Sequence, residues 1–393
     1  MSKTVIKNAR VITPDGLLEN ACISFENGKI NGVGYFDIPS NTEYDIIDAE
    51  GGYAVAGFVE THVHGGGGHD FMDGSVDAFC EIVNTHAAHG TTSILPTTIA
   101  CAEDEMFRLF DVYRQAQKRS LDASLLGIHL EGPFIASAMK GAQPEAYVRS
   151  PSKREIDRIV DEAGDIVKRC SMAPEIEGVE YAAKKLRSAG IGLSIAHSDA
   201  VAEDVFRAYG MGFDHITHFY CNTPSVRKIG QTRYAGVVEA AYLLDGMSVD
   251  LIGDGKHIPK ELMRMVLKLK GVDKVAVITD AMRAAGTDVT ESYLGKKCPE
   301  ARVIIEDGVA KLPDRSFFAG SIATSDVAFR TLVREFGTDI CDASEMMSAL
   351  PAKLCGVENR KGLLKLGYDA DIVVLDGELN VKGVWTNGRK ITA

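Results

Sequence analysis

The middle of the chain alternates short apolar runs with longer segments whose apolar residues recur at helical spacing. Patterns such as SVDAFCEIVNTHAAH and PKELMRMVLKLK are typical of helices packed on one face. Eight strands that alternate with such connections predict an α/β fold, a TIM-like (β/α)8 barrel. After a β-rich insertion near residues 300–320, a helix-rich stretch would complete it. The runs that predict strands are 58–64, 92–96, 124–131, 166–172, 191–197, 213–218, 248–253 and 275–279.

The two ends of the chain have a different pattern, in which short β-rich runs are separated by turn residues. Asp15-Gly16 and Asn27-Gly28 lie between such runs, and both dipeptides favour hairpin turns. DADIVVLD and VKGVWTNGR are the corresponding runs near the C-terminus. Because neither end has enough apolar residues to fold alone, we expect both to form one small β-sandwich domain. The predicted domains are 1–55 plus 355–393 for this unit and 56–354 for the barrel.

Polar residues gather at the C-terminal ends of the predicted strands, where barrel enzymes place their chemistry. His62 and His64 share one face of a strand, since alternate residues point the same way. Taken singly, a strand-end histidine is more often structural, and a strand-end Asp is a common helix N-cap. Taken together, their convergence on one rim favours a metal site with a neighbouring acid or base. The residues are His62, His64, Glu131, His197, His218 and Asp280.

Four glycines, Gly65 to Gly68, follow the histidine pair directly. They are either a flexible turn or a means of keeping bulk away from the site. If the histidines bind a metal, we expect the glycines to keep the entrance of the metal site free of side chains.

The types of side chain at the rim indicate the chemistry. Imidazole nitrogens with one carboxylate suit Zn²⁺ or Fe²⁺, whereas Mg²⁺ and Ca²⁺ prefer oxygen ligands. A catalytic metal keeps one position for water, whose pKa can fall to roughly 7. A carboxylate beside that water can accept its proton and return it to a leaving group. Asp280 fits this role in the hydrolysis of an amide or ester.

Composition narrows the partners and the compartment. With 43 Lys and Arg against 55 Asp and Glu, the formal net charge is −12, which argues against nucleic acid or an anionic membrane. No apolar run is long enough to span a bilayer. The eight cysteines form no C-x-x-C pair, so we expect reduced thiols and a cytoplasmic location.

The order of short motifs along the chain gives a family resemblance. It is similar to that of N-acetylglucosamine-6-phosphate deacetylases of the amidohydrolase superfamily, over essentially the whole chain. The motifs are H-x-H at 62–64, H-L-E-G-P at 129–133, A-P-E at 173–175, A-H-S at 196–198, T-H at 217–218, D-G-x-H at 254–257, T-D-A-M at 279–282 and A-G-S at 319–321.

The resemblance implies hydrolysis of the acetamide of N-acetylglucosamine 6-phosphate to acetate and glucosamine 6-phosphate. Asp280 would be the proton shuttle. A divalent metal is implied, Zn²⁺ ahead of Fe²⁺, with one or two ions per subunit. By match to the motifs, the principal metal would be held by Glu131, His197 and His218. His62 and His64 would hold a second metal if two ions bind, or line the site if only one does.

Substrate contacts follow from the same resemblance. Arg233 would grip the phosphate of the neighbouring subunit's substrate, which implies a homodimer, and nearby Arg227 is a rival for that role. Gln143 stands where the family often has His, and Asn222 lies one place later than the family's asparagine, so the sugar epimer stays open. The predicted substrate-binding residues are Ala142, Gln143, Asn222, Thr223, Arg233, His257, Ala319, Gly320 and Ser321.

Two other functions compete with this one. The same chemistry could act on another N-acetyl sugar phosphate, such as N-acetylgalactosamine 6-phosphate. Alternatively, the barrel could be a non-catalytic binding protein. The second alternative predicts that a metal ligand or the proton shuttle is missing, and none is missing from this sequence.

Overall fold

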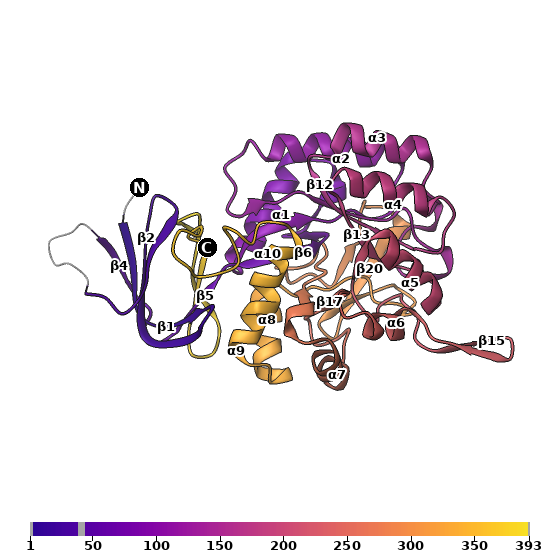
Figure 1. Cartoon of the computed structure of the whole chain (residues 1–393). Helices are drawn as coiled ribbons and strands as arrows, with labels where there is room; N and C mark the ends of the chain where they lie inside the picture. Colours follow the sequence, from indigo (N-terminus) through magenta and orange to yellow (C-terminus); the bar gives the residue numbers. More distant parts are fainter. Residues whose placement is uncertain (1–2, 38–43, 392–393) are drawn as a thin grey trace.

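The structure is a computed structural model that describes residues 3–37 and 44–391. Within these ranges, eight parallel strands form the wall of the predicted barrel (Figure 1). Isolated bridges between Thr97 and His129 and between Val63 and Ala281 join the two hydrogen-bonded sheets, so the wall closes. The strands are β6 (Phe58–Val63), β9 (Thr91–Pro96), β11 (Ile128–Glu131), β12 (Val167–Met172), β13 (Gly192–Ile195), β14 (Phe213–Ile216), β17 (Ser248–Ile252) and β18 (Val275–Ile278).

These strands read as apolar runs because helices cover their outer face and side chains fill the barrel inside. Every residue of β6, β9 and β18 is buried. The polar residues among them therefore have no access to bulk water and need partners within the protein.

Helices follow most of the strands and form the outer layer (Figure 1). The helix predicted from SVDAFCEIVNTHAAH begins after Ser75, whose hydroxyl accepts a hydrogen bond from the Ala78 N–H at 3.4 Å. No helix in the described part of the chain is long and apolar enough to cross a membrane. The helices are α1 (Val76–Ala88), α2 (Glu103–Ala116), α3 (Lys153–Ala163), α4 (Val179–Ser188), α5 (Ala202–Met211), α6 (Val237–Leu243), α7 (Lys260–Lys270), α8 (Ser325–Arg330), α9 (Ile340–Ser344) and α10 (Leu350–Leu354).

The two chain ends meet in a separate sheet-rich unit beside the barrel (Figure 1). Hydrogen bonds join its strands into one continuous sheet with its own core around Phe25 and Trp385. Asn27 and Gly28 both have positive φ, 52° and 78°, as a type I′ hairpin turn requires. The strands are β1 (Lys3–Thr13), β2 (Gly16–Glu26), β3 (Lys29–Gly34), β4 (Tyr44–Asp48), β5 (Tyr53–Ala56), β22 (Ile372–Leu375), β23 (Val381–Thr386) and β24 (Arg389–Ile391).

Three small β elements lie outside the wall of the barrel. The ribbon of β7 (Gly65–Gly66) and β8 (His69–Asp70) follows β6. A hairpin of β15 (Arg227–Ile229) and β16 (Thr232–Tyr234) projects from the body (Figure 1). The predicted β-rich insertion is a sheet of β19 (Glu291–Tyr293), β20 (Arg302–Glu306) and β21 (Val309–Lys311).

Candidate metal centre

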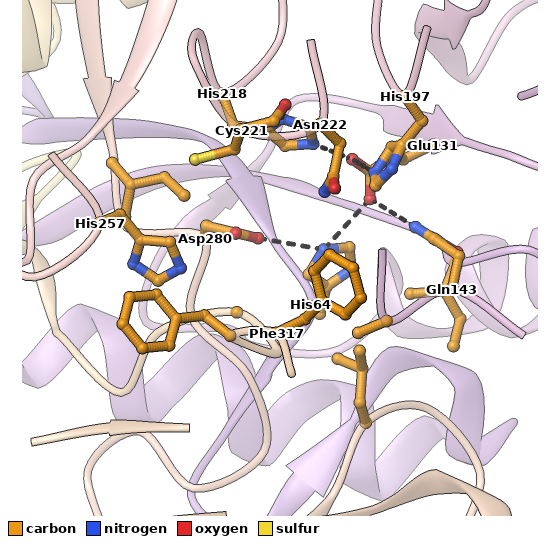
Figure 2. A pocket seen from close by; sticks show the side chains of 16 residues that line it. His64, Glu131, Gln143, His197, His218, Cys221, Asn222, His257, Asp280 and Phe317 are labelled. Atoms are coloured by element: carbon orange, nitrogen blue, oxygen red, sulfur yellow. Dashed lines mark hydrogen bonds and ion pairs between the residues drawn. The ribbon is translucent and has the colours of Figure 1, made fainter. Parts of the chain in front are cut away.

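The strand-end residues singled out from the sequence converge at one end of the barrel, around the carboxylate of Glu131 (Figure 2). Glu131 Oε1 lies 2.6 Å from His218 Nε2 and 3.2 Å from His197 Nε2. Its other oxygen, Oε2, lies 3.4 Å from His64 Nε2 and 3.6 Å from His62 Nε2. Two ligand groups, each with two imidazoles, therefore share one carboxylate.

The histidine tautomers leave ring nitrogens that need a cation. His197 Nδ1 donates to the Met139 carbonyl at 2.9 Å, and His218 Nδ1 donates to the Cys221 carbonyl at 3.2 Å. In the neutral imidazole the other nitrogen, Nε2, then carries a lone pair. Both lone pairs point at the Glu131 carboxylate, which is repulsive unless a cation or proton lies between them. The donor set fits a divalent metal, since metal-bound histidines are oriented in this way by a carbonyl on the far nitrogen.

The pKa shifts of the residues at the centre also favour a bound cation. Burial alone would raise the pKa of Glu131, but His62, His197 and His218 hold it well below its ordinary value. Burial lowers the pKa of His218, but the neighbouring Glu131 carboxylate raises it more strongly, so the pKa reaches about 9. Without a metal the centre therefore takes up protons, which a metal ion would displace.

Asp280 lies beside the shared carboxylate. Its Oδ1 is 3.2 Å from His64 Nε2 and 3.4 Å from His62 Nε2. Burial raises its pKa, but the hydrogen bond from His64 and the charges of the neighbouring histidines bring it below the ordinary value. Its backbone is fixed on both sides, because its N–H donates to the His62 carbonyl at 3.0 Å and its carbonyl accepts from the Ser321 N–H at 2.8 Å. An ionised, immobile carboxylate can act as a base.

Three of these residues have strained backbones. His197, His218 and Asp280 have φ of 45°, 33° and 50°, a region that residues with a side chain rarely adopt. Each lies two residues after the end of a barrel strand, where the chain leaves the wall and turns the side chain toward the pocket. Such strain persists only where the surroundings over-determine the conformation, which is typical of functional sites.

Glu60, which the sequence analysis did not single out, secures the seam between the first and last strands. Its carboxylate accepts hydrogen bonds from the His62 and Thr279 N–H groups, each at 3.0 Å. Burial raises its pKa to about 8. The carboxyl thereby joins the strand that carries His62 to the strand that leads to Asp280. An acidic residue within an apolar run was the signal that could have revealed it.

The glycines after His64 do not clear the mouth of the site, so that expectation was wrong. A Cβ on Gly66 would lie 2.9 Å from His86 Nε2, and one on Gly67 would lie 2.4 Å from Thr85 Oγ1. They let the ribbon pack closely against α1. His86 of α1 is buried there and donates to the Gly65 carbonyl at 2.9 Å.

A pocket of about 300 Å³ opens over the centre (Figure 2). His62 lies behind it. Of the residues predicted from the sequence, it is lined by His64, Glu131, Ala142, Gln143, His197, His218, Asn222, His257, Asp280 and Gly320. The sequence analysis missed six further lining residues, namely Ile99, Cys221, Ile252, Leu294, Phe317 and Phe318. Two adjacent exposed phenylalanines directly before Ala319 and Gly320 were a signal for the last pair.

Four predicted substrate-binding residues do not line this pocket. Thr223 is buried nearby, and the N–H of Ala319 donates to the Ala310 carbonyl at 3.0 Å. Ser321 Oγ donates to the Thr279 carbonyl at 2.5 Å, so it supports the turn at Asp280. Arg233 is exposed on β16 of the projecting hairpin.

A phosphate bound in this pocket would need a positively charged side chain as a partner. Among the described residues that line it, none is a lysine or an arginine. Arg227 is held by the Asp199 side chain and carbonyl of the same chain. Within one copy of the chain, therefore, neither arginine proposed from the sequence reaches the pocket.

Comparisons with known proteins agree with this geometry. The model of the amidohydrolase family matches residues 53–391. The chain is 31% identical to an N-acetylglucosamine-6-phosphate deacetylase of Lysinibacillus sphaericus, over 95% of this chain and 94% of that protein. It is 29% identical to an N-acetylgalactosamine-6-phosphate deacetylase of Escherichia coli O157:H7, over 98% of each. The solved structure of N-acetylglucosamine-6-phosphate deacetylase from Pasteurella multocida superposes with a TM-score of 0.91 at 27% identity, covering 100% of both chains.

Proposed function

Because this chain belongs to the amidohydrolase family, we propose that it hydrolyses the acetamide of N-acetylglucosamine 6-phosphate to acetate and glucosamine 6-phosphate. The observation that carries the proposal is the convergence of four imidazoles on Glu131 beside the ionised Asp280. The relatives of this name in Lysinibacillus sphaericus and Bacillus subtilis, at 31% and 30% identity, support the choice of substrate.

A divalent cation would be held by Glu131, His197 and His218. Zn²⁺ suits these donors best, with Fe²⁺ as the next candidate. Because Glu131 presents its second oxygen to His62 and His64, the chain also has ligands for a second ion. When bound, the metal would polarise the amide carbonyl and lower the pKa of the attacking water.

The proton steps fall to Asp280. As a carboxylate it accepts the proton of the attacking water at Oδ1 or Oδ2. It then donates this proton to the amide nitrogen as the carbon–nitrogen bond breaks, so that the amino sugar leaves as a neutral amine. Gln143 donates from Nε2 to Glu131 Oε2 at 2.9 Å and holds that carboxylate in place during the cycle.

The rim would orient the sugar phosphate. Asn222 and His257 line the pocket and offer polar groups to the sugar, and His257 is fixed by Asp254 Oδ2, 2.8 Å from its Nδ1. Since none of the described residues that line the pocket is a lysine or an arginine, we propose that the chain forms a homodimer in which Arg233 from the partner's hairpin binds the phosphate. A guanidinium suits this role because it donates two parallel hydrogen bonds. The exposed apolar side chains of Ile229 on this hairpin and of Val226 directly before it support an interface there.

The proposed setting is the cytoplasm. All eight cysteines are free thiols, which fits a reducing compartment.

Acetate release from purified enzyme tests the proposal. The expected result is release from N-acetylglucosamine 6-phosphate, with much less from unphosphorylated N-acetylglucosamine. The second candidate substrate is N-acetylgalactosamine 6-phosphate, favoured by the relatives of that name. A higher kcat/KM for this epimer would replace the first assignment, and no acetate from either would refute the function.

A further inference from the structure

A second cavity of about 510 Å³ lies directly beside the pocket over the metal centre. The two share four lining residues, Ile99, Ala142, Gln143 and Leu294. These side chains form a partition, with the metal centre on one side and the second cavity, here called the side cavity, on the other. Nothing in the proposed reaction uses the side cavity.

The lining of the side cavity suits an apolar group better than an anion. Its three lysines are matched by three glutamates among the lining residues. Lys296 pairs with Glu105, and Lys140 Nζ lies 3.9 Å from Glu145 Oε2. Between these pairs the lining is largely apolar, contributed by Met72, Ile99, Ala100, Ala142, Leu294, Val303 and Leu312. Matched charges leave no excess positive field for a phosphate or carboxylate.

Hydrogen bonds hold the partition in place. Gln143 Oε1 accepts from the Ala100 N–H at 2.6 Å, while its Nε2 donates to Glu131. The N–H of Gly295 donates to Asp70 Oδ2 at 2.8 Å, and a Cβ on Gly295 would lie only 2.2 Å from Ile99 Cδ1. Ile99 therefore packs tightly on the backbone that carries Leu294. Leu294 and Ile99 stay nearly fully buried, at 8% and 4% exposure.

The geometry of an amide decides which group meets this partition. The carbonyl carbon carries the nitrogen and the acyl carbon on different sides, and the carbonyl carbon itself must lie near Glu131 and Asp280. If the sugar on the nitrogen extends toward Asn222 and His257, as in the proposed function, the acyl carbon is directed to the other side of the pocket. The apolar side chains of Ile99 and Leu294 line both this pocket and the side cavity, so they are the candidates for that side.

We propose that Ile99 and Leu294 form the seat of the acyl methyl group and set the length of the acyl chain. Leu294 closes the pocket after the methyl group, and the side cavity of about 510 Å³ behind it would admit a longer acyl chain. This inference rests on the proposed function, because it takes the position of the sugar from it.

An N-acyl series of glucosamine 6-phosphate tests the inference, with N-acetyl, N-propionyl and N-butyryl substrates and release of the free amine as the readout. For the wild type, kcat/KM is expected to fall by at least about tenfold from acetyl to butyryl, because the longer chain meets Leu294. In Leu294→Ala, the ratio of acetyl to butyryl kcat/KM should shrink by at least about tenfold. Leu312→Ala is the matched control, since Leu312 lines the side cavity alone, and its ratio should stay within about twofold of wild type.

The outcomes separate this inference from the function on which it depends. An unchanged ratio in Leu294→Ala, or an equal change in Leu312→Ala, would overturn the acyl seat while acetate release still upheld the deacetylase. Failure of the wild type to cleave any member would overturn both. Should Leu294→Ala fail to fold, Ile99→Val is the second variant, for which the same ratio should shrink by a smaller factor and an unchanged ratio counts against the seat.

Discussion

The residues at the strand ends and the loop residues at the entrance of the pocket, here called its rim, lie in different surroundings. Glu131 and His62 are at most 1% exposed, and the carboxylate of Glu131 is held by Gln143 and His218. At the rim, Phe317 and Phe318 are 51% and 42% exposed, and Arg233 lies on a hairpin that projects from the body (Figure 1). The centre is part of the barrel's core, whereas the rim is carried by loops.

This difference separates chemistry from specificity. Buried groups on a rigid wall are held where charge develops in the reaction, which affects the transition state. Loop residues contact parts of the substrate that do not react, which affects binding. Substitutions at the strand ends should therefore lower kcat, and substitutions at the rim should mainly raise KM.

The largest effect is expected for Asp280→Asn. An amide cannot accept the proton of the attacking water, so kcat should fall by at least about 10²-fold, while KM and the bound metal stay near wild type. Asp371→Asn is the matched control, because Asp371 is also buried but pairs with Lys361 outside the barrel core. It should lower stability and leave kcat unchanged. Steady-state kinetics with metal analysis measures both, and an unchanged kcat in Asp280→Asn would remove this residue from the mechanism.

A smaller effect is expected at the rim for Arg233→Ala. Loss of the guanidinium should raise KM for the sugar phosphate by about tenfold or more, with little change in kcat. Arg227→Ala is the control and should change KM far less, because Arg227 already pairs with Asp199.

The same variant also tests whether the arginine acts across a dimer. Co-expressed Arg233→Ala and Asp280→Asn chains should form mixed dimers with one intact site. These dimers should combine the kcat that Asp280→Asn lacks with the low KM that Arg233→Ala lacks. Absence of recovery in mixed dimers verified by mass spectrometry would contradict a contribution from the partner.

The smallest effect is on the pH dependence of folding stability. Because the pKa of His218 is raised to about 9 in the metal-free protein, its protonation stabilises the fold below the unfolded pKa of about 6.5. This stability is lost as the pH rises toward 9. The lowered pKa values of Glu131 and Asp280 act only in the acid range. Denaturant unfolding with a chelator at pH 6.5 and 9 should show a decrease in stability that Zn²⁺ reduces, and a rise with pH would contradict the assignment.

Sequence analysis succeeded where a pattern had one physical cause. The eight apolar runs predicted the barrel strands within a few residues, since strands covered on both faces must be apolar. Polar residues at their ends, such as Glu131 and Asp280, had to lie close together because the parallel strands of a barrel all end on the same side of it. The centre could therefore be assembled from residues far apart in the chain.

It failed where packing between distant segments decides. Whether a side chain would fit at the glycines after His64 depends on how closely α1 packs against them. No local sequence pattern reveals that packing. In the sequence, Glu60 is an isolated acidic residue within an apolar strand. Its role becomes clear only when the contact between the first and last strands of the barrel is known. Phe317 and Leu294 reach the pocket only because the insertion folds back over the barrel.

The most direct test of the central claim is the position of a bound metal in a crystal of this protein grown with Zn²⁺. An anomalous-scattering map should show a peak about 2.0–2.2 Å from a Glu131 oxygen and from the Nε2 atoms of His197 and His218. The peak should be absent from crystals of Glu131→Gln grown in the same way. A zinc peak elsewhere, or none at this centre in the wild type, would contradict the account.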